Sequence, residues 1–179
     1  MTYTVRTDKQ VLSMLSVYQW SNLVCLVLVA GINIFQVLRA NGLVAAQMAD
    51  NLNGGTGISP ETILMLSIVL AIYLLKTFFE AKHVRKRMKY VCLSMLNDGV
   101  EGVSLSNPTK EDIDHPKGLH FSIKYAQIHE VSIANVLLMR RQTAPALLLD
   151  CGDMVYTLPA LEDIVHIKSQ LTTAIAKKI

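Results

Sequence analysis

The sequence has few charged residues for its length. Only 17% of the 179 residues are Asp, Glu, Lys or Arg, whereas 51% are apolar, and the mean hydropathy is +0.36. Such a composition leaves too few polar side chains to cover an ordinary soluble surface. We therefore expect lipid to replace water around part of the chain.

Cysteine is scarce as well, since only Cys25, Cys92 and Cys151 are present, far apart in the sequence. An odd number of cysteines in separate settings is unsuited to a disulfide framework, and it favours a reducing compartment on the C-terminal side.

Motifs for catalysis and metal binding are missing from the sequence. The five histidines include no pair at the spacing of a zinc helix, and the acidic residues Glu111, Asp112 and Asp114 lack the glycine and later glutamate of a calcium loop. No glycine-rich phosphate loop follows a strand, and no serine or cysteine lies on a nucleophile elbow. The sequence therefore predicts a protein that is not an enzyme and that uses no cofactor or metal.

What the chain does have is two long apolar runs. Val17–Leu38 contains no charged side chain, and Ile63–Phe79 contains only Lys76. A helix needs about 20 residues to cross a bilayer, so both runs are candidate transmembrane helices. The first run could instead be a secretory signal, but it is long, ends in Phe35–Arg39 rather than in small residues, and precedes a second run. We expect both runs to be retained.

The distribution of charged residues predicts the orientation of the chain in the membrane. Directly after the second run comes a basic cluster, whereas the loop between the runs carries only Arg39, Asp50 and Glu61. Basic residues next to a span resist translocation, so this pattern predicts a multi-pass protein of the cell membrane with both termini in the cytoplasm. The same ammonium and guanidinium groups could also recruit anionic lipid. The region from Asn97 onward has slightly more acids than bases, which disfavours nucleic-acid binding. The basic cluster consists of Lys82, Arg85, Lys86, Arg87 and Lys89.

Polar residues in the first run fall on one helical face. Carboxamides that face hydrocarbon are costly, so this polar stripe should face the second run or another protomer. In the second run Ser67 and Ala71 form a small-residue face, and we expect the stripe to pack there. Helix packing is the simpler interpretation, and a transport path or peptide-binding groove is the alternative. The stripe comprises Asn22, Cys25, Val29, Asn33 and Gln36.

The pattern Ser59-Pro60-Glu61 predicts that the second helix begins near Pro60. No breaker follows until Asn97, so this helix should emerge as a basic stalk that ends around Leu96. Before it we expect a helical extension over Asn41–Asp50 and a turn over Asn51–Gly57.

After Gly99 the hydrophobic period changes from helical to alternating. Cys151–Asp153 marks a tight turn, and Asn107–Gly118 should form a long loop. The predicted domains are a cytoplasmic tail over 1–16, a transmembrane hairpin with its stalk over 17–96, and a cytoplasmic domain over 97–179. The predicted strands lie around Val103 and Leu105 and over 121–125, 128–138, 146–150 and 154–158, with an amphipathic helix over 160–178.

Four segments of this domain resemble a known family. Asn97–Gly102, Phe121–Val131, Leu147–Leu149 and Tyr156–Leu158, followed by a closing helix, are similar to bacterial pleckstrin-homology-like (PH-like) domains. Those that follow a two-span hairpin are the YcxB-like membrane proteins. The resemblance implies an α+β fold, with a small antiparallel curled sheet or partial barrel capped by a C-terminal helix, and it carries over no catalytic residues. Thr2–Arg6 alternates and could supply a missing edge strand.

These features predict a membrane-anchored interaction module whose partners are membrane lipids and either another protein or a second copy of the chain. The alternative is an accessory subunit of a transporter, or a bacteriocin-immunity-type protein, acting through its spans. Lipid sensing by the cytoplasmic domain is a third class, which is disfavoured because the sequence shows no basic pocket beyond Arg140 and Arg141.

Overall fold

A computed structural model describes residues 3–41, 60–105, 117–140 and 142–177. The chain divides into two compact units. The helical unit is Val17–Phe79, and the head is Met1–Ser16 together with Glu80–Ile179. The head therefore begins earlier than the predicted boundary at Asn97, because it includes the basic cluster. The predicted extension as far as Asp50, the turn after it and most of the loop before Gly118 lie outside the described residues.

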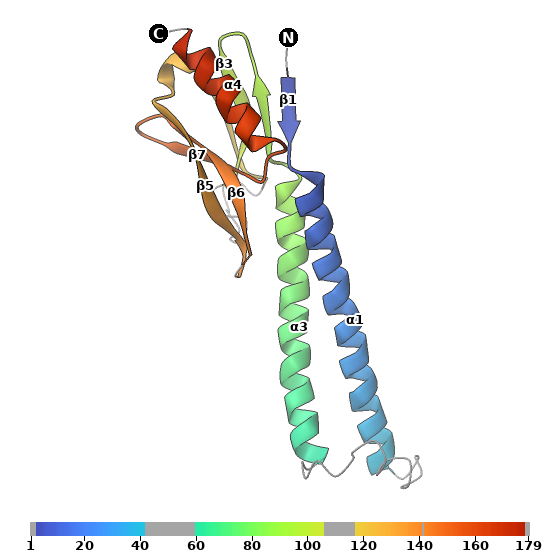
Figure 1. Ribbon diagram of the computed structural model, residues 1–179. Helices are drawn as coiled ribbons and strands as arrows, with labels where there is room; N and C mark the ends of the chain where they lie inside the picture. Colours follow the sequence, from blue (N-terminus) through green and yellow to red (C-terminus); the bar gives the residue numbers. More distant parts are fainter. Residues whose placement is uncertain (1–2, 42–59, 106–116, 141, 178–179) are drawn as a thin grey trace. The chain divides into compact units, whose positions relative to one another are not determined.

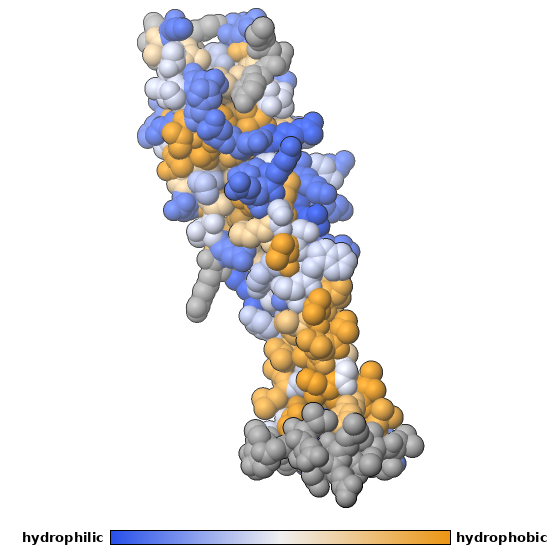
Figure 2. All heavy atoms as spheres, turned by 45° about the vertical axis from the view of Figure 1, so that its right-hand side comes forward, coloured by the Kyte–Doolittle hydropathy of each residue, from blue (hydrophilic) through white to orange (hydrophobic). Residues whose placement is uncertain are grey.

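The two long apolar helices are confirmed (Figure 1). Helix α1 spans Lys9–Ala40 and helix α3 spans Pro60–Met88, so the second helix starts where the Ser-Pro-Glu pattern predicts. Both are long and apolar enough to cross a membrane, and only 6% and 11% of their most apolar windows are buried. The core helix of a soluble protein would be mostly buried, whereas these helices present their apolar side chains outward. Figure 2 shows this hydrophobic surface on the visible face of the helices.

The first sheet of the head combines strands from both ends of the helical pair. Its antiparallel order is β1 (Tyr3–Arg6), β2 (Cys92–Met95), β3 (Gly99–Ser104) and β4 (Leu119–Lys124). The predicted N-terminal edge strand is present, since β1 pairs with β2 alone in this sheet. Within β1, Val5 is buried between two exposed neighbours, as expected for a strand with one face in the core.

The second helix is shorter than predicted. It ends at Met88, and Cys92–Met95, which the sequence assigned to a stalk ending near Leu96, forms the strand between β1 and β3. A tight turn at Tyr90 and Val91, with i+3 hydrogen bonds, closes the helix. No glycine or proline marks this end. Pairing with two neighbouring strands overrides the local helical pattern here.

The second sheet and the terminal helix complete the head. The sheet consists of β5 (Glu130–Met139), β6 (Gln142–Asp150) and β7 (Val155–Pro159) in antiparallel order. A short 3-10 helix, η1 (Tyr125–Gln127), joins it to β4, and helix α4 (Ile164–Ala176) follows it. The predicted strands and amphipathic helix are therefore confirmed as an α+β arrangement, although they form two sheets where the sequence predicted one.

The two sheets are hydrogen-bonded at one corner. The hydroxyl of Ser104 donates to the carbonyl of Thr157 at 3.1 Å and accepts from its N–H at 3.0 Å. Beside it, the N–H of Leu105 donates to the same carbonyl at 2.8 Å. Both polar side chains are buried, so these bonds satisfy groups that would otherwise be costly to desolvate. The core of the head includes the fully buried side chains of Leu93, Leu138, Leu147, Leu149, Leu158, Ile167 and Leu171.

Candidate functional site

The polar stripe of α1 meets α3 at Asn33. Ser67 Oγ lies 2.5 Å from Asn33 Oδ1 and 2.7 Å from the carbonyl oxygen of Leu64, so its one hydroxyl proton is shared between these two acceptors. The Nδ2 of Asn33 donates in turn to the backbone carbonyl of Val29 at 2.9 Å. Both polar atoms of the carboxamide are thus satisfied within the helical unit, and Ser67 is buried. This contact joins the predicted stripe to the small-residue face.

The other carboxamides of the stripe are less well satisfied. Asn22 is 9% exposed, and within the described part of the chain its Nδ2 has no hydrogen-bond partner. The Oε1 of Gln36 is likewise buried without one. Ala71 is half-buried, and no hydrogen bond links its neighbourhood to Asn22 or Gln36 among the described residues. The structure therefore pairs Asn33 with Ser67 and leaves two predicted stripe residues as buried polar groups.

The basic cluster divides between surface and interior. Lys82, Lys86 and Lys89 are exposed and Arg85 is half-buried. Arg87 is only 4% exposed, so it is not available at the surface of the head as the sequence predicted. The helical period explains the difference, because Arg87 lies on the face of α3 that carries the buried residues Val84 and Met88.

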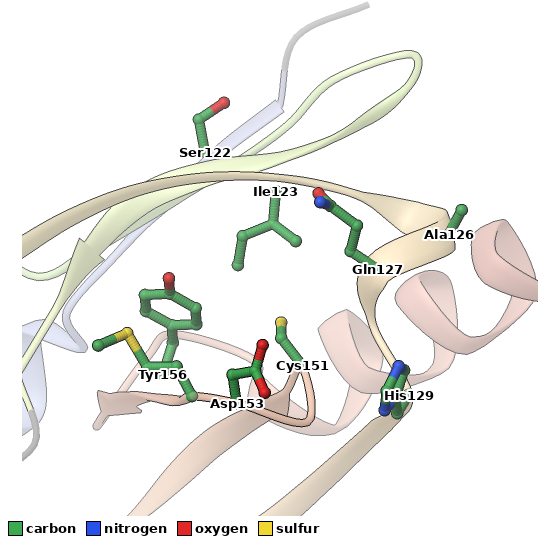
Figure 3. Close-up of a pocket in the computed structure, with 9 residues that line it drawn as sticks. Ser122, Ile123, Ala126, Gln127, His129, Cys151, Asp153 and Tyr156 are labelled. Carbon is green, nitrogen blue, oxygen red and sulfur yellow. The ribbon is translucent and has the colours of Figure 1, made fainter.

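Several polar side chains of the head line an open pocket of about 440 Å³, called the head pocket (Figure 3). It is formed by β4, η1, the residue before β5, the β6–β7 turn and β7. Ile123 extends into it from β4, and the side chains of Cys151 and Tyr156 extend into it from the opposite wall. Its lining is Ser122, Ile123, Ala126, Gln127, His129, Cys151, Asp153, Met154 and Tyr156.

The β6–β7 turn shapes one wall of the head pocket. Gly152 adopts a φ of 83°, a conformation that glycine adopts readily, and its N–H donates to Asp150 Oδ1 at 2.8 Å. The ring of His129 covers this glycine so closely that a Cβ there would lie 2.9 Å from its Cε1. The tight turn predicted at Cys151–Asp153 is thus present, and it fixes His129 at the pocket rim.

The opposite wall is fixed by the end of β4. The N–H of Lys124 donates to Gln127 Oε1 at 3.0 Å, which holds the Gln127 side chain over the pocket. Tyr125 Oη donates to the carbonyl of Leu96 at 2.9 Å, tying η1 to the first sheet. On the floor, Ile123 and Tyr156 line the pocket, and the ring of Tyr156 packs against that of Phe121, which lies outside the lining, with centroids 4.7 Å apart. The pocket therefore combines an apolar floor with a polar rim.

The Cys151 thiol of the head pocket is held in its protonated form. Burial raises its pKa above the usual value, and the neighbouring Asp150 carboxylate raises it further. A thiolate is the nucleophilic form of cysteine, so this environment works against covalent chemistry at Cys151. No group of three or more His, Cys, Asp or Glu side chains suited to a metal ion occurs among the described residues. Binding through shape and hydrogen bonds is the chemistry that this lining supports.

A second pocket of the head, of about 410 Å³, was not predicted. It gathers cations from β1, α1 and the residue after α3, and we call it the basic pocket. The sequence predicted only an edge strand over Thr2–Arg6, because Arg6 and Lys9 lie about 80 residues from Lys89 along the chain. The alternation of Thr4 and Arg6 in the predicted edge strand was the available signal. The polar lining of the basic pocket is Thr4, Arg6, Thr7, Lys9, Lys89 and Glu162.

The fold thus defines an α+β protein with two long apolar helices and a head of antiparallel sheets and a C-terminal helix, on which the two pockets lie. No protein-family model, curated protein or solved structure matches the chain.

Proposed function

We propose that this protein is a membrane-anchored interaction module without enzymatic activity, whose helices lie in lipid and whose head binds a protein partner in the cytoplasm. The exposed apolar surface of the helices supports the membrane role. Side chains such as Val27, Leu28, Val69 and Ile72 are more than 60% exposed, and water around them would be unfavourable. Meanwhile the carboxamide of Asn33 accepts from Ser67 and donates to the carbonyl of Val29, so its polar atoms are satisfied within the helical unit.

The pairing of β1 with β2 supports the proposed membrane topology. Strand β1 precedes α1 and strand β2 follows α3, yet they belong to one sheet with Thr4 opposite Ser94 and Arg6 opposite Cys92. A sheet cannot form across a bilayer, so helices that cross it must enter and leave on the same side. A hairpin of two spans meets this requirement, and the exposed lysines at positions 82, 86 and 89 favour the cytoplasmic side.

Membrane insertion and orientation are tested together on intact and lysed cells. We expect the chain to stay in the membrane fraction after alkaline carbonate washing, and the head to be digested by added protease only after lysis. Recovery in the aqueous fraction would contradict the membrane role. Digestion of the head in intact cells would contradict the orientation alone.

The head itself is proposed to be a PH-like domain. Its order of four strands, three strands and a closing helix fits the curled sheet capped by a helix that the family resemblance implies. The buried contacts of Ser104 with Thr157 bring the two sheets together at one corner, as a partial barrel requires.

The head pocket is the proposed binding site for the protein partner, and both another protein and a second copy of the chain are candidates. Its apolar floor and polar rim suit an extended peptide, with backbone groups meeting Gln127 and Asp153. Exposed apolar side chains adjoin it, since Met154 and Val155 are 49% and 50% exposed.

Site-specific photocrosslinking in living cells tests this assignment. A photoreactive residue at Met154 should yield a discrete crosslinked band, whereas the same residue at Val165, which is 70% exposed on α4 and outside the pocket, should not. A band at a multiple of the chain's own mass identifies a second copy as the partner. Equal labelling at both positions, or none at Met154, would contradict the pocket as the binding site.

The alternative places the function in the spans, as in an accessory transporter subunit or an immunity protein. Buried polar groups at Asn22 and Gln36 favour it, because such groups in membrane helices often serve a path or a partner. Replacing Asn33 and Gln36 with leucine in the full chain separates the two functions. The interaction module predicts that crosslinking at Met154 persists in this variant and that export and sensitivity to the membrane-active peptide stay unchanged. The alternative predicts lost export or increased sensitivity to that peptide.

A further inference from the structure

The basic pocket brings together cations that no ion pair neutralises. Arg6 comes from β1, Lys9 from the first turn of α1 and Lys89 from the residue after α3. Among the described residues of the lining, Glu162 is the only carboxylate, which leaves an excess of positive charge. Over the described ranges of the chain, none of the three cations has an ion-pair partner. Unpaired cations converging on a concave surface favour an anionic ligand.

The walls of this pocket are held in place by hydrogen bonds. Thr7 is 5% exposed, and its Oγ1 donates to the carbonyl of Met88 at 2.5 Å, which fixes β1 against the end of α3. The hydroxyls of Thr4 and Ser94 are 2.9 Å apart across β1 and β2. The N–H of Glu162 donates to the carbonyl of Arg6 at 3.0 Å. The cations therefore project from a fixed frame, which lowers the entropic cost of binding.

The residue types match a phosphate group. An arginine presents a planar fork that pairs with two phosphate oxygens, and lysines add mobile point charges. Lys9 is also in the first turn of α1, where the helix dipole favours an anion, although Asp8 Oδ1 already accepts the N–H of Gln10 at 2.7 Å. A volume of about 410 Å³ is enough for a phosphate with a small polar substituent.

The pocket is also close along the chain to the proposed membrane segment. Lys9 precedes Val17, where the charge-free run begins, by eight residues of the same helix. At about 1.5 Å per residue this separation is about 12 Å, a few ångströms more than the headgroup layer of about 5–8 Å on one side of a bilayer.

We propose that the basic pocket binds the phosphate-bearing headgroup of an anionic phospholipid through Arg6, Lys9 and Lys89. This inference rests on the proposed membrane role, because a lipid source requires the helices to lie in the bilayer. A free phosphate or phosphate ester shares the same chemistry and is the competing source.

Binding is measured on the full chain in neutral detergent by titration with soluble short-chain phosphatidylglycerol, short-chain phosphatidylcholine and inorganic phosphate. Phosphatidylglycerol should bind saturably and more tightly than the other two probes. The double variant Arg6→Gln/Lys89→Gln should weaken this binding roughly tenfold. The matched control Lys82→Gln/Lys86→Gln removes the same charge from exposed positions of α3 outside the pocket, and it should change the binding less than twofold.

Several results would overturn the assignment. Equal weakening by the control pair would indicate diffuse surface attraction, and inorganic phosphate binding as tightly as phosphatidylglycerol would indicate a free anion. Absence of saturable binding would remove the site altogether. Arg6→Lys/Lys89→Arg, which keeps the charge, should restore most of the affinity and excludes misfolding as the cause. Carbonate extraction of the same variants reports membrane integration separately, so loss of the membrane role is distinguishable from loss of the pocket.

Discussion

Ser67 Oγ donates a hydrogen bond to Asn33 Oδ1 across the two apolar helices, at 2.5 Å. Hydrogen bonds between membrane helices contribute about 0.6 kcal/mol on average and at most about 1.7 kcal/mol. We expect a double-mutant cycle with Asn33→Leu and Ser67→Ala to give a coupling free energy in this range. The cycle is measured by reversible unfolding in mixed micelles.

The control is a second double-mutant cycle, which combines Asn33→Leu with Ser21→Ala. Ser21 Oγ donates at 2.9 Å to the carbonyl of Tyr18 within α1 and makes no bond to α3 in the described structure. Its coupling to Asn33→Leu should be zero within error. A coupling of zero for the Ser67 cycle as well would show that the interhelical bond contributes nothing to stability.

The buried hydrogen bond of Thr7 should contribute to the stability of the head. Thr7→Val keeps the shape of the side chain but removes the buried bond to the carbonyl of Met88, so it should cost about 1 kcal/mol of unfolding free energy. Thr7→Ser keeps the donor and should cost less. Denaturant unfolding of the full chain, followed by circular dichroism, measures both. A loss for Thr7→Ser as large as that for Thr7→Val would contradict the prediction that the hydroxyl contributes more to stability than the methyl group.

Gly102 tests the close approach of β2 and β3. A Cβ at this position would collide with the backbone carbonyl oxygen of Cys92, and it would lie 3.1 Å from Cζ of Phe121. Gly102→Ala should therefore destabilise the head by about 1–3 kcal/mol. Gly31→Ala is the matched control, because nothing lies within 4 Å of its added methyl and α1 should gain up to about 1 kcal/mol. If Gly102→Ala and Gly31→Ala shifted the melting temperature by similar amounts in the same direction, the close approach of β2 and β3 at Gly102 would be contradicted.

The Cys151 thiol predicts a pH dependence. Since burial and Asp150 both raise its pKa, alkylation of Cys151 should accelerate only at higher pH than that of a free thiol. Asp150→Asn removes the nearby negative charge but keeps an acceptor for the N–H of Gly152, so it should lower the pKa and shift the rate curve to lower pH. Rates are followed by mass spectrometry in a Cys25→Ser/Cys92→Ser background. An unshifted curve would leave burial as the sole cause.

Local patterns predicted most of the fold because the signals were periodic. The charge-free run from Val17, the Ser-Pro-Glu start at Pro60 and the alternation over Phe121–Lys124 each depend on neighbours within a few residues. The strand at Cys92–Met95 was missed because its sequence continues a helical pattern without a breaker. Its strand conformation depends on pairing with β1 and β3, which are distant from each other along the chain.

The binding surfaces were harder to predict for the same reason. The basic pocket requires β1 to lie beside the end of α3, a contact between distant parts of the chain that no local period encodes. The head pocket likewise joins the end of β4 to the turn before β7. Arg87 was placed at the surface because composition alone does not distinguish the faces of a helix that carries Arg85, Lys86 and Arg87 in succession.

The bridge between Thr7 and Leu161 has a consequence for biosynthesis. The ribosome releases the N-terminal segment first, but Leu161 is made 154 residues after Thr7, which at about 5–20 residues per second takes roughly 8–30 s. Throughout this interval the bridge between Thr7 and Leu161 is missing from the nascent head. It forms only after both helices have been translated. A truncation that removes the first eight residues would spare insertion yet leave a head that never finishes folding.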